Sequence, residues 1–466
     1  MNVWAAHPSS DEPRLPIELG PVSSDEYAPL PVAPTVAEAA RRAMAAAQDS
    51  ARRTGMSRRS FLRSAAGYAS VLFFLNACAR EAARGGARPG TPGGAFDVSS
   101  EATIDQEAAG AAVGGEEFVF DVQSHLLQFD LEQPLGSFFG QNFPQAGCGE
   151  GDPRACFSIE HYLEEIFLNS DTTMIVLSAL PIVTRDHPLS IEVMEQAREL
   201  ADRLCGPGRL LLHGQANPSL GALEDTLAGM EQLVSDHPIA AWKVYTHTAG
   251  PGWRLDDADP AAPAVGRAFI EQARALGVPR ICVHKGVSGN DPWSSPADIG
   301  PAAAAYPDVA FLVYHSGWEP GITEGPYEQA TRNVGVNRLI TSLRDAGVGP
   351  GDNAYAELGT TWFNLMRSPD EAAHVLGKLL RHLGPANIMW GTDSIWYGSP
   401  QQQLVAFRAF ELSSEFMDRY GYPPLTGDVK RAILGGNAAR VYGVDPVTVR
   451  CAFSREELER IRQGRA

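Results

Sequence analysis

Seven side chains suited to metal binding or proton transfer stand at the ends of apolar segments in this sequence. They are Gln123, His125, Lys243, His284, His315, Glu357 and Asp393. Gln123 and His125 are two residues apart, so in a β-strand both point to the same face. Imidazole and carboxylate groups that converge can hold Zn²⁺ or a similar divalent ion and leave a position open for water. Such an ion lowers the pKa of bound water to roughly 7, which makes hydroxide available at neutral pH.

Each of these residues also has a purely structural explanation. A single histidine at a strand end is more often a hydrogen-bonded structural group than a ligand, and Lys243 is equally suited to a salt bridge. Glu357 has the alternative of a solvated loop charge. The recurrence of such residues at six separate strand ends favours a shared site, because barrel enzymes keep their chemistry there.

The segments that carry these residues alternate with amphipathic stretches, as in a series of βαβ units. The expected strands are Phe118–His125, Thr172–Leu180, Arg209–Gln215, Ile239–Thr246, Arg280–His284, Ala310–His315, Asn353–Leu358 and Asn387–Asp393. Their nearly continuous apolar character is typical of parallel strands covered on both faces. The pattern predicts a (β/α)8 barrel over residues 116–445 with the site at its C-terminal mouth, and a tail helix over 446–466. A doubly wound open sheet is the alternative, although no Gly-rich phosphate loop follows a strand.

The first 115 residues differ in composition from the rest. Residues 1–55 are rich in Pro, Ala, Ser and charge, which predicts a disordered extension with a short helix over Val36–Arg53. Residues 81–115 have the composition of a linker. Between these two parts, Ser57-Arg58-Arg59-Ser60-Phe61-Leu62-Arg63 is followed by an apolar run from Ala65 to Ala77 that is short for a membrane span.

Residues 56–80 resemble a twin-arginine export signal. The resemblance implies recognition by the twin-arginine translocation machinery and a periplasmic or other extracytoplasmic location. Leu75-Asn76-Ala77-Cys78 loosely resembles a lipobox, which would place a lipid anchor on Cys78, although Asn76 is atypical there. Met56 directly precedes the signal, so Met1 and Met56 both stay candidate start residues.

The charge of the chain excludes one class of partner. The formal net charge is −18, and an acidic surface repels phosphate backbones, so we expect no nucleic-acid partner. We expect a small-molecule substrate, and Trp396 is among the aromatic residues suited to a pocket for a planar or apolar compound. Ordinary packing explains any single aromatic residue equally well. Assembly into a homo-oligomer is left open.

Five short motifs occur in order along the predicted barrel. They are Phe120-Asp121-Val122-Gln123-Ser124-His125, Val283-His284-Lys285, Tyr314-His315-Ser316-Gly317, Trp390-Gly391-Thr392-Asp393 and Gly436-Asn437-Ala438-Ala439-Arg440. Together they resemble the amidohydrolase-related family of metal-dependent barrels, over roughly Glu116–Val444. That family includes hydrolases as well as aminocarboxymuconate-semialdehyde and resorcylate-type decarboxylases, so the resemblance implies a fold and a metal but not one reaction.

The resemblance also implies roles for the histidines and for Asp393. His125 and His284 would be metal ligands, and Asp393 a ligand or the base that handles the water proton. His315 would be the catalytic acid or base, or a further ligand in a binuclear variant.

We assign the remaining candidate residues to substrate binding. Lys243 stands where other amidohydrolases carry a metal-bridging carboxylated lysine, but that role is not expected in the decarboxylase-like members. We therefore expect it to bind substrate as a catalytic cation, with Gln123, Glu357 and Trp396 as further substrate contacts.

Gln123 departs from the family pattern, in which the first strand usually carries His-x-His. An amide oxygen is a weak, neutral ligand that suits Zn²⁺ poorly. Three outcomes are open: an ion held by His125, His284 and Asp393 alone, a harder ion such as Mn²⁺ or Mg²⁺, or no metal. We expect one divalent metal, with Zn²⁺ as the first choice.

Three functions are compatible with these residues. The leading prediction is a metal-dependent hydrolase, in which activated water attacks an amide, ester or lactone carbon and His315 assists the leaving group. The alternative is non-oxidative decarboxylation of an aromatic or unsaturated acid, with Asp393 or His315 protonating carbon. The third is a catalytically degenerate exported barrel that binds a ligand, which the substitution at Gln123 keeps open.

Overall fold

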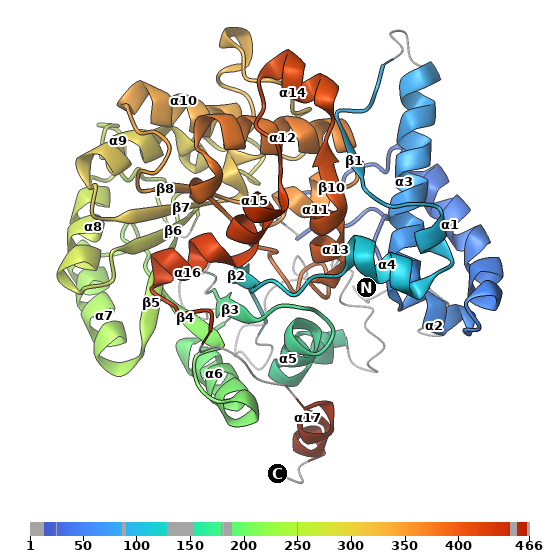
Figure 1. Ribbon diagram of the computed structural model, residues 1–466. Helices are drawn as coiled ribbons and strands as arrows, with labels where there is room; N and C mark the ends of the chain where they lie inside the picture. The colour runs from blue at the N-terminus through green and yellow to red at the C-terminus, as the bar shows by residue number, and fades with distance from the viewer. Residues whose placement is uncertain are drawn as a thin grey trace, which may run out of the picture.

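The chain is built around a closed barrel of eight parallel strands. The computed structural model describes residues 14–24, 26–85, 90–127, 153–178, 180, 189–248, 250–447 and 454–463. The strands are hydrogen-bonded in chain order, and Figure 1 shows them surrounded by helices. They are β2 (Phe120–Ser124), β3 (Met174–Leu177), β4 (Leu210–Gln215), β5 (Ile239–Tyr245), β6 (Arg280–His284), β7 (Ala310–Tyr314), β8 (Ala354–Glu357) and β9 (Ile388–Met389).

The first and last strands close the barrel through bonds that extend beyond β9. Val122 N donates to Trp390 O at 3.1 Å, and Asp393 N donates to Gln123 O at 3.0 Å. The predicted (β/α)8 barrel is confirmed, and each of the eight expected strands contains one observed strand.

Helices cover the outside of the barrel. They are α5 (Ile159–Phe167), α6 (Ile191–Cys205), α7 (Leu223–Asp236), α8 (Gly266–Ala275), α9 (Ile299–Ala305), α10 (Asn337–Ala346), α11 (Thr361–Leu365), α12 (Pro369–His382), α13 (Gln401–Ala409) and α14 (Ser414–Tyr420). Apolar residues at helical spacing explain their docking: α10 buries Leu339, Ile340 and Leu343 on one stripe. The N-termini of α5 and α6 are capped by Ser158 and Ser190, whose side chains accept backbone N–H bonds.

The N-terminal end of the barrel is closed by an apolar floor. A short helix, α15 (Gly427–Arg431), leads through one π-helical turn into α16 (Asn437–Tyr442). Asn437 Nδ2 donates to Ile388 O at 2.7 Å, and the Tyr442 ring packs on Phe120 at 5.3 Å between centroids. Side chains fill this end of the barrel. Within the described residues, the open end is therefore the opposite one, where the polar residues at the ends of the strands lie.

The described residues before the barrel are folded onto it: the helix expected over Val36–Arg53 is present, and segments expected to be a disordered extension or a linker are folded as well. They form α1 (Pro34–Arg53), α2 (Arg58–Leu62), α3 (Ala65–Gly85), β1 (Gly94–Phe96) and α4 (Gln106–Val113), with β1 paired antiparallel to β10 (Phe410–Leu412). On α1 the residues Ala39, Ala43, Ala47 and Ala51 are fully covered at four-residue spacing. Small side chains on one stripe let α1 and α3 approach closely, so an alanine-rich composition is compatible with packing here as well as with disorder.

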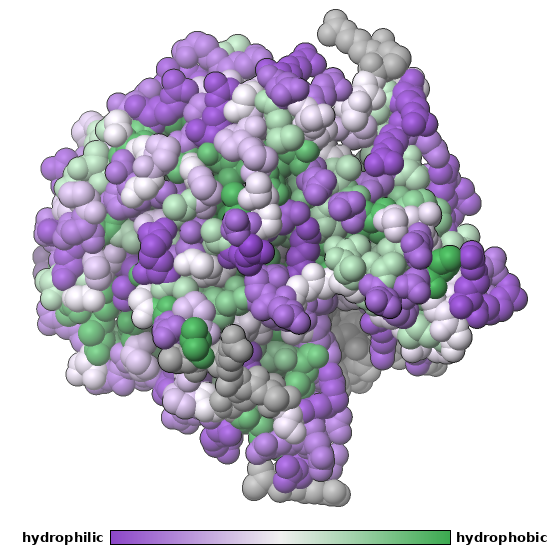
Figure 2. Space-filling model, in the orientation of Figure 1, coloured by the Kyte–Doolittle hydropathy of each residue, from purple (hydrophilic) through white to green (hydrophobic). Residues whose placement is uncertain are grey.

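The N-terminal helices stand together beside the barrel in Figure 1. Hydrophilic residues cover most of the face shown in Figure 2, and hydrophobic residues gather in smaller areas, one of them between the barrel and these helices. The C-terminal tail contains α17 (Arg455–Arg462), whose Arg462 pairs with Glu164 of α5 at 2.7 Å.

The segment that resembles an export signal is part of α2 and α3. Asn76, the atypical residue of the lipobox-like sequence, donates through Nδ2 to Phe96 O at 2.5 Å and accepts from Phe96 N at 2.9 Å. Cys78 is buried and is a free thiol. Within the described residues no helix has the length and apolar character needed to cross a membrane. Export and lipidation at Cys78 stay predictions.

Candidate active site at the barrel mouth

The first and last strands bring three predicted residues together. His125 Nε2 lies 3.2 Å from Asp393 Oδ1, and Gln123 Nε2 donates to the same oxygen at 2.9 Å. The expectation that Gln123 and His125 share a face therefore agrees with the structure. All three side chains are buried, with about 1% of each exposed.

The Gly391-Thr392-Asp393 motif positions the carboxylate. Thr392 donates through both N and Oγ1 to the carboxylate of Asp121 on β2. A Cβ on Gly391 would lie 1.6 Å from Glu357 Oε1, so only glycine fits beside that carboxylate. Asp393 itself has a φ of 61°, a left-handed conformation that turns its side chain back toward the first strand.

Hydrogen bonds set the tautomer of His125. Its Nδ1 lies 2.8 Å from Ser178 O, and a carbonyl can only accept, so Nδ1 carries the proton. Burial lowers the pKa of His125, so the ring is neutral at pH 7 and Nε2 presents a lone pair. That lone pair faces Asp393 Oδ1. A proton or a metal ion shared between Nε2 and Asp393 Oδ1 would satisfy both atoms.

Asp393 is an ionised carboxylate in this arrangement. Burial raises the pKa of Asp393, but the hydrogen bond with a protonated His125, the positive charge of His315 when it is protonated and the hydrogen bond from Thr360 outweigh burial and hold it at about 2. The carboxylate is thus ionised when a cation, whether a proton or a metal ion, lies beside it. Its second oxygen, Oδ2, accepts a hydrogen bond from Thr360 Oγ1. The carboxylate is therefore charged and fixed in orientation at neutral pH.

His284 and His315 form a second group of nitrogen ligands. His315 Nε2 lies 3.2 Å from His284 Nδ1, and His315 Nδ1 donates to Gly359 O at 2.8 Å. Burial lowers the pKa of His315 to about 4 and, together with the charges of neighbouring imidazoles, lowers that of His284 well below its ordinary value. Both rings are therefore neutral at pH 7, as metal ligands must be.

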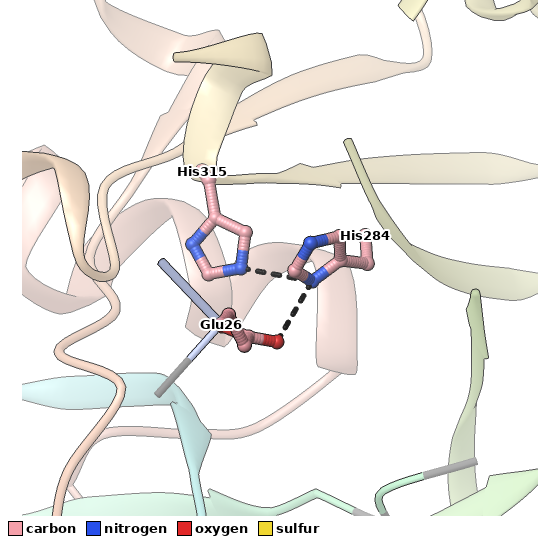
Figure 3. A group of neighbouring side chains, drawn as sticks. All are labelled: Glu26, His284 and His315. Carbon is pink, nitrogen blue, oxygen red and sulfur yellow. Dashed lines mark hydrogen bonds and ion pairs between the residues drawn. The ribbon is translucent and has the colours of Figure 1, made fainter. Parts of the chain in front are cut away.

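A residue from the N-terminal segment reaches this pair. Glu26 Oε1 lies 3.6 Å from His284 Nδ1 and accepts from Tyr245 OH at 3.2 Å. Figure 3 shows Glu26, His284 and His315 directed toward one another. Ligand atoms of these three residues all lie within 4.8 Å of one another. Burial and the charge of Asp393 raise the pKa of Glu26 to about 8. We had placed Glu26 in a disordered extension, and no periodicity or motif around it indicated the site.

Lys243 lies on β5 inside the barrel and is fully buried. Its Nζ sits 4.1 Å from the centroid of the Tyr314 ring, and it has no hydrogen-bond partner among the residues that the structure describes. Burial lowers the pKa of Lys243 to about 8, while the charges of Asp393 and Glu26 oppose that shift. Lys243 is therefore mostly a cation at pH 7, in cation–π contact with Tyr314 and Tyr245.

Glu357 and Trp396 contact protein groups where we predicted substrate contacts. Glu357 Oε2 accepts from His315 N at 3.0 Å, and its Oε1 accepts from Gly359 N. Burial raises the pKa of Glu357 to about 8. The Trp396 ring stacks on His125 with a centroid separation of 5.2 Å and an angle of 10°. Both residues thus hold predicted site histidines in place, and a contact of either with substrate stays a prediction.

Two further residues of the site follow the strand alternation and could have been found from it. Tyr245 stands two positions after Lys243, and its ring stacks on His284 at 4.4 Å between centroids. His247 stands two positions further and lies 5.0 Å from His284. Residues at this spacing share a face while the chain stays extended.

The donor set fits a divalent cation. His125 Nε2 and Asp393 Oδ1 face each other as acceptors, and the buried atoms Gln123 Oε1 and His284 Nε2 lack partners among the described residues. Neutral imidazoles with their other nitrogen bonded to carbonyl oxygens are the usual form of histidine ligands. His125, His284 and Asp393 stay the predicted ligands of such an ion, whereas the described group whose ligand atoms lie within 4.8 Å of one another is Glu26, His284 and His315.

Comparison with known proteins identifies the relatives of this barrel. A family model described as amidohydrolase matches residues 192–444, more than half of the chain. No curated protein sequence matches the chain. A solved structure of an uncharacterized TIM-barrel protein from Bordetella bronchiseptica is 13% identical, with a TM-score of 0.46, covering 70% of this chain and 98% of that chain.

Two further solved structures resemble the barrel. The IDCase of Metarhizium anisopliae in its apo form is 17% identical with a TM-score of 0.37, covering 70% of this chain and 97% of that one. The 5-carboxyvanillate decarboxylase LigW2 of Novosphingobium aromaticivorans, solved with bound manganese and a nitrobenzoic acid, is 12% identical with a TM-score of 0.42. The match covers 70% of this chain and 97% of that chain.

Proposed function

This chain belongs to the amidohydrolase family of metal-dependent barrel enzymes, and we propose that it removes the carboxylate of a small aromatic or unsaturated acid as CO2. The reaction is the non-oxidative decarboxylation that the sequence offered as the alternative to hydrolysis.

The buried ammonium of Lys243 carries this proposal. A fully buried cation without a hydrogen-bonding partner is costly, and the cost is offset when a ligand brings an anion. Lys243 Nζ meets two aromatic faces, Tyr314 at 4.1 Å and Tyr245 at 5.0 Å, in an interior that also contains Asp393. Tyrosine faces beside a cation suit a flat anion such as an unsaturated carboxylate.

The chemistry balances with groups of this site. The bond between the carboxylate carbon and the ring or alkene carbon breaks, and its electron pair stays on the latter carbon. That carbon takes one proton, so R–COO⁻ and H⁺ give R–H and CO2. Asp393 or His315 delivers the proton, after taking it up from solvent because neither is protonated at pH 7.

A divalent ion bound by His125, His284 and Asp393 would polarise an oxygen of the substrate and neutralise charge as it develops. The other side chains hold the predicted ligands in place and exclude water from the site. Trp396 and Tyr245 pack on His125 and His284 and keep both rings oriented. The burial of these groups strengthens the electrostatic interactions between them.

Hydrolysis of an amide, ester or lactone is the second candidate, and the ionised state of Asp393 favours it. A carboxylate whose pKa is held at about 2 is a base at pH 7 and can accept a proton from water. Decarboxylation uses the same residue as an acid, which requires that substrate binding raise its pKa.

Isotope labelling separates the two reactions. The metal-loaded full-length protein is incubated with aromatic and unsaturated acids carrying ¹³C in the carboxyl group, and with amides, esters and lactones in H₂¹⁸O. We expect labelled CO2 from one of the acids and, in D₂O, one deuterium on the carbon that lost it. Incorporation of ¹⁸O into an amide, ester or lactone product, with no CO2 from any acid, would overturn the proposal in favour of hydrolysis.

A further inference from the structure

The segment that precedes α1 lies across the barrel mouth and is anchored there at several points. Glu18 N donates to Gln402 Oε1 at 2.8 Å, and Arg367 Nη1 donates to Gly20 O at 2.9 Å. Tyr27 OH lies 3.1 Å from Tyr397 OH and accepts from Asn364 Nδ2 at 3.0 Å. These contacts flank Glu26, so its position at the site does not depend on a single bond.

Glu26 points inward from this anchored segment. Its side chain is only 23% exposed, and Oε2 accepts from Ser24 Oγ at 3.0 Å. The other oxygen, Oε1, faces His284 Nδ1 at 3.6 Å, in the group that also contains His315. A cation shared with the two imidazoles would stabilise the ionised form of this buried carboxyl group.

Two of the three spacings in this group fit a single coordination sphere. Two atoms bound to the same ion at about 2.0–2.2 Å lie at most about 4.4 Å apart. His284 Nδ1 lies 3.2 Å from His315 Nε2 and 3.6 Å from Glu26 Oε1, so both pairs satisfy this limit. Glu26 therefore lies within reach of an ion that His284 binds.

The first strand carries Gln123 where the amidohydrolase-related family usually carries a histidine ligand. Gln123 donates its Nε2 to Asp393, and its side chain brings no negative charge. A carboxylate adds the charge and the hard oxygen that an amide lacks, and oxygen ligands suit Mn²⁺ and Mg²⁺ as well as Zn²⁺.

We propose that Glu26 is a metal ligand, supplied to the barrel site by the N-terminal segment in compensation for Gln123. This inference rests on the proposed metal-dependent function. It also ties the complete site to a chain that keeps residue 26, because cleavage within residues 56–80 would remove this ligand while leaving the barrel intact.

The test compares metal binding by two variants of the same segment. Metal-stripped full-length protein, Glu26→Gln and the matched control Glu18→Gln are titrated with Mn²⁺ and with Zn²⁺ by calorimetry. Glu18 lies in the same anchored segment, and its Oε1 accepts from Gly20 N rather than facing a histidine. We expect the Kd of Glu26→Gln to rise at least about tenfold, the scale seen when even outer partners of metal ligands are lost. The Kd of Glu18→Gln should equal that of the unmodified protein.

A spectroscopic measurement gives a second, independent result. The visible absorption of bound Co²⁺ depends on its ligands, so it should change in Glu26→Gln and stay unchanged in Glu18→Gln. Glu26→Asp retains the carboxylate and serves if Glu26→Gln does not fold, as judged by its melting temperature without metal. We expect this variant to give an altered Co²⁺ spectrum and a raised Kd, because the shorter side chain moves the oxygen from His284.

The possible results separate the two proposals. If the unmodified protein binds neither ion, the metal-dependent function fails. If it binds an ion and the Glu26 variants match it in Kd and Co²⁺ spectrum, the metal site stands and the role of Glu26 is overturned.

Discussion

Two fully buried lysines on neighbouring strands mark two regions of the barrel wall with opposite surroundings. Lys243 on β5 faces the barrel interior and has no hydrogen-bond partner among the described residues. Lys285, directly after β6, points outward to the layer between strands and helices. Its Nζ donates to Asp298 Oδ2 at 2.8 Å, to Thr246 Oγ1 at 3.0 Å and to Trp293 O at 3.2 Å.

Burial alone therefore does not distinguish a lysine with a structural role from one with a functional role. In the outer layer every proton of the Lys285 ammonium has an acceptor, and Asp298 supplies the opposite charge. In the interior the Lys243 ammonium meets only aromatic faces within close contact. A buried charge with fixed partners stabilises one packing arrangement, whereas a buried charge without them is available to a ligand.

The largest expected effect is on the stability of the outer layer. Lys285→Met leaves the Asp298 carboxylate buried without its cation, which should lower the free energy of unfolding by about 3–5 kcal/mol. Denaturant unfolding followed by circular dichroism measures this loss. A loss below about 1 kcal/mol would show that the Lys285 pair has no structural importance.

The second expected effect is on catalysis at the site. Lys243→Met should lower kcat/KM for the acid substrate about 10²-fold, because the anion loses its buried partner. The free energy of unfolding should stay within about 1 kcal/mol of the original or rise, since an unpaired buried charge is removed. A loss of stability as large as that of Lys285→Met would show that the two lysines do not differ in the way described here.

The smallest expected effect is a pH dependence confined to the site lysine. The pKa of Lys243 is lowered to about 8, so the ammonium is present below that pH and lost above it. KM for the acid substrate should therefore rise above about pH 8 and approach a tenfold increase per unit. Lys243→Arg keeps its charge throughout this range. The KM of this variant, measured from initial rates, should therefore show no such rise. An equal rise in both proteins would assign the dependence to another group.

Much of the barrel could be predicted from local sequence patterns. Nearly continuous apolar runs separated by amphipathic stretches locate the strands, because parallel barrel strands are covered on both faces. Within a strand, residues two apart share a face. The same rule placed Gln123 and His125 together, and both contact Asp393 Oδ1 in the structure. Extending that rule from Lys243 to the end of β5 and just past it would also have identified Tyr245 and His247.

Composition was a poor guide to the first 115 residues. Proline and alanine lower the apolar area that each residue can bury, which predicts disorder when the segment is considered alone. Once folded, Ala39, Ala43 and Ala47 line one stripe of α1, and the row of small side chains permits close helix packing. That outcome depends on the partner helix, which composition does not describe.

The amino-acid sequence alone determined the barrel, the strand ends that carry chemistry and the family, because each depends on alternation or motifs within a few residues. Only the tertiary structure decided which groups face one another. Glu26 reaches His284 from a segment distant in the chain, and backbone N–H groups donate to both oxygens of Glu357. Lys243 has no hydrogen-bond partner among the described residues. These are properties of packing between distant segments, and no local pattern records them.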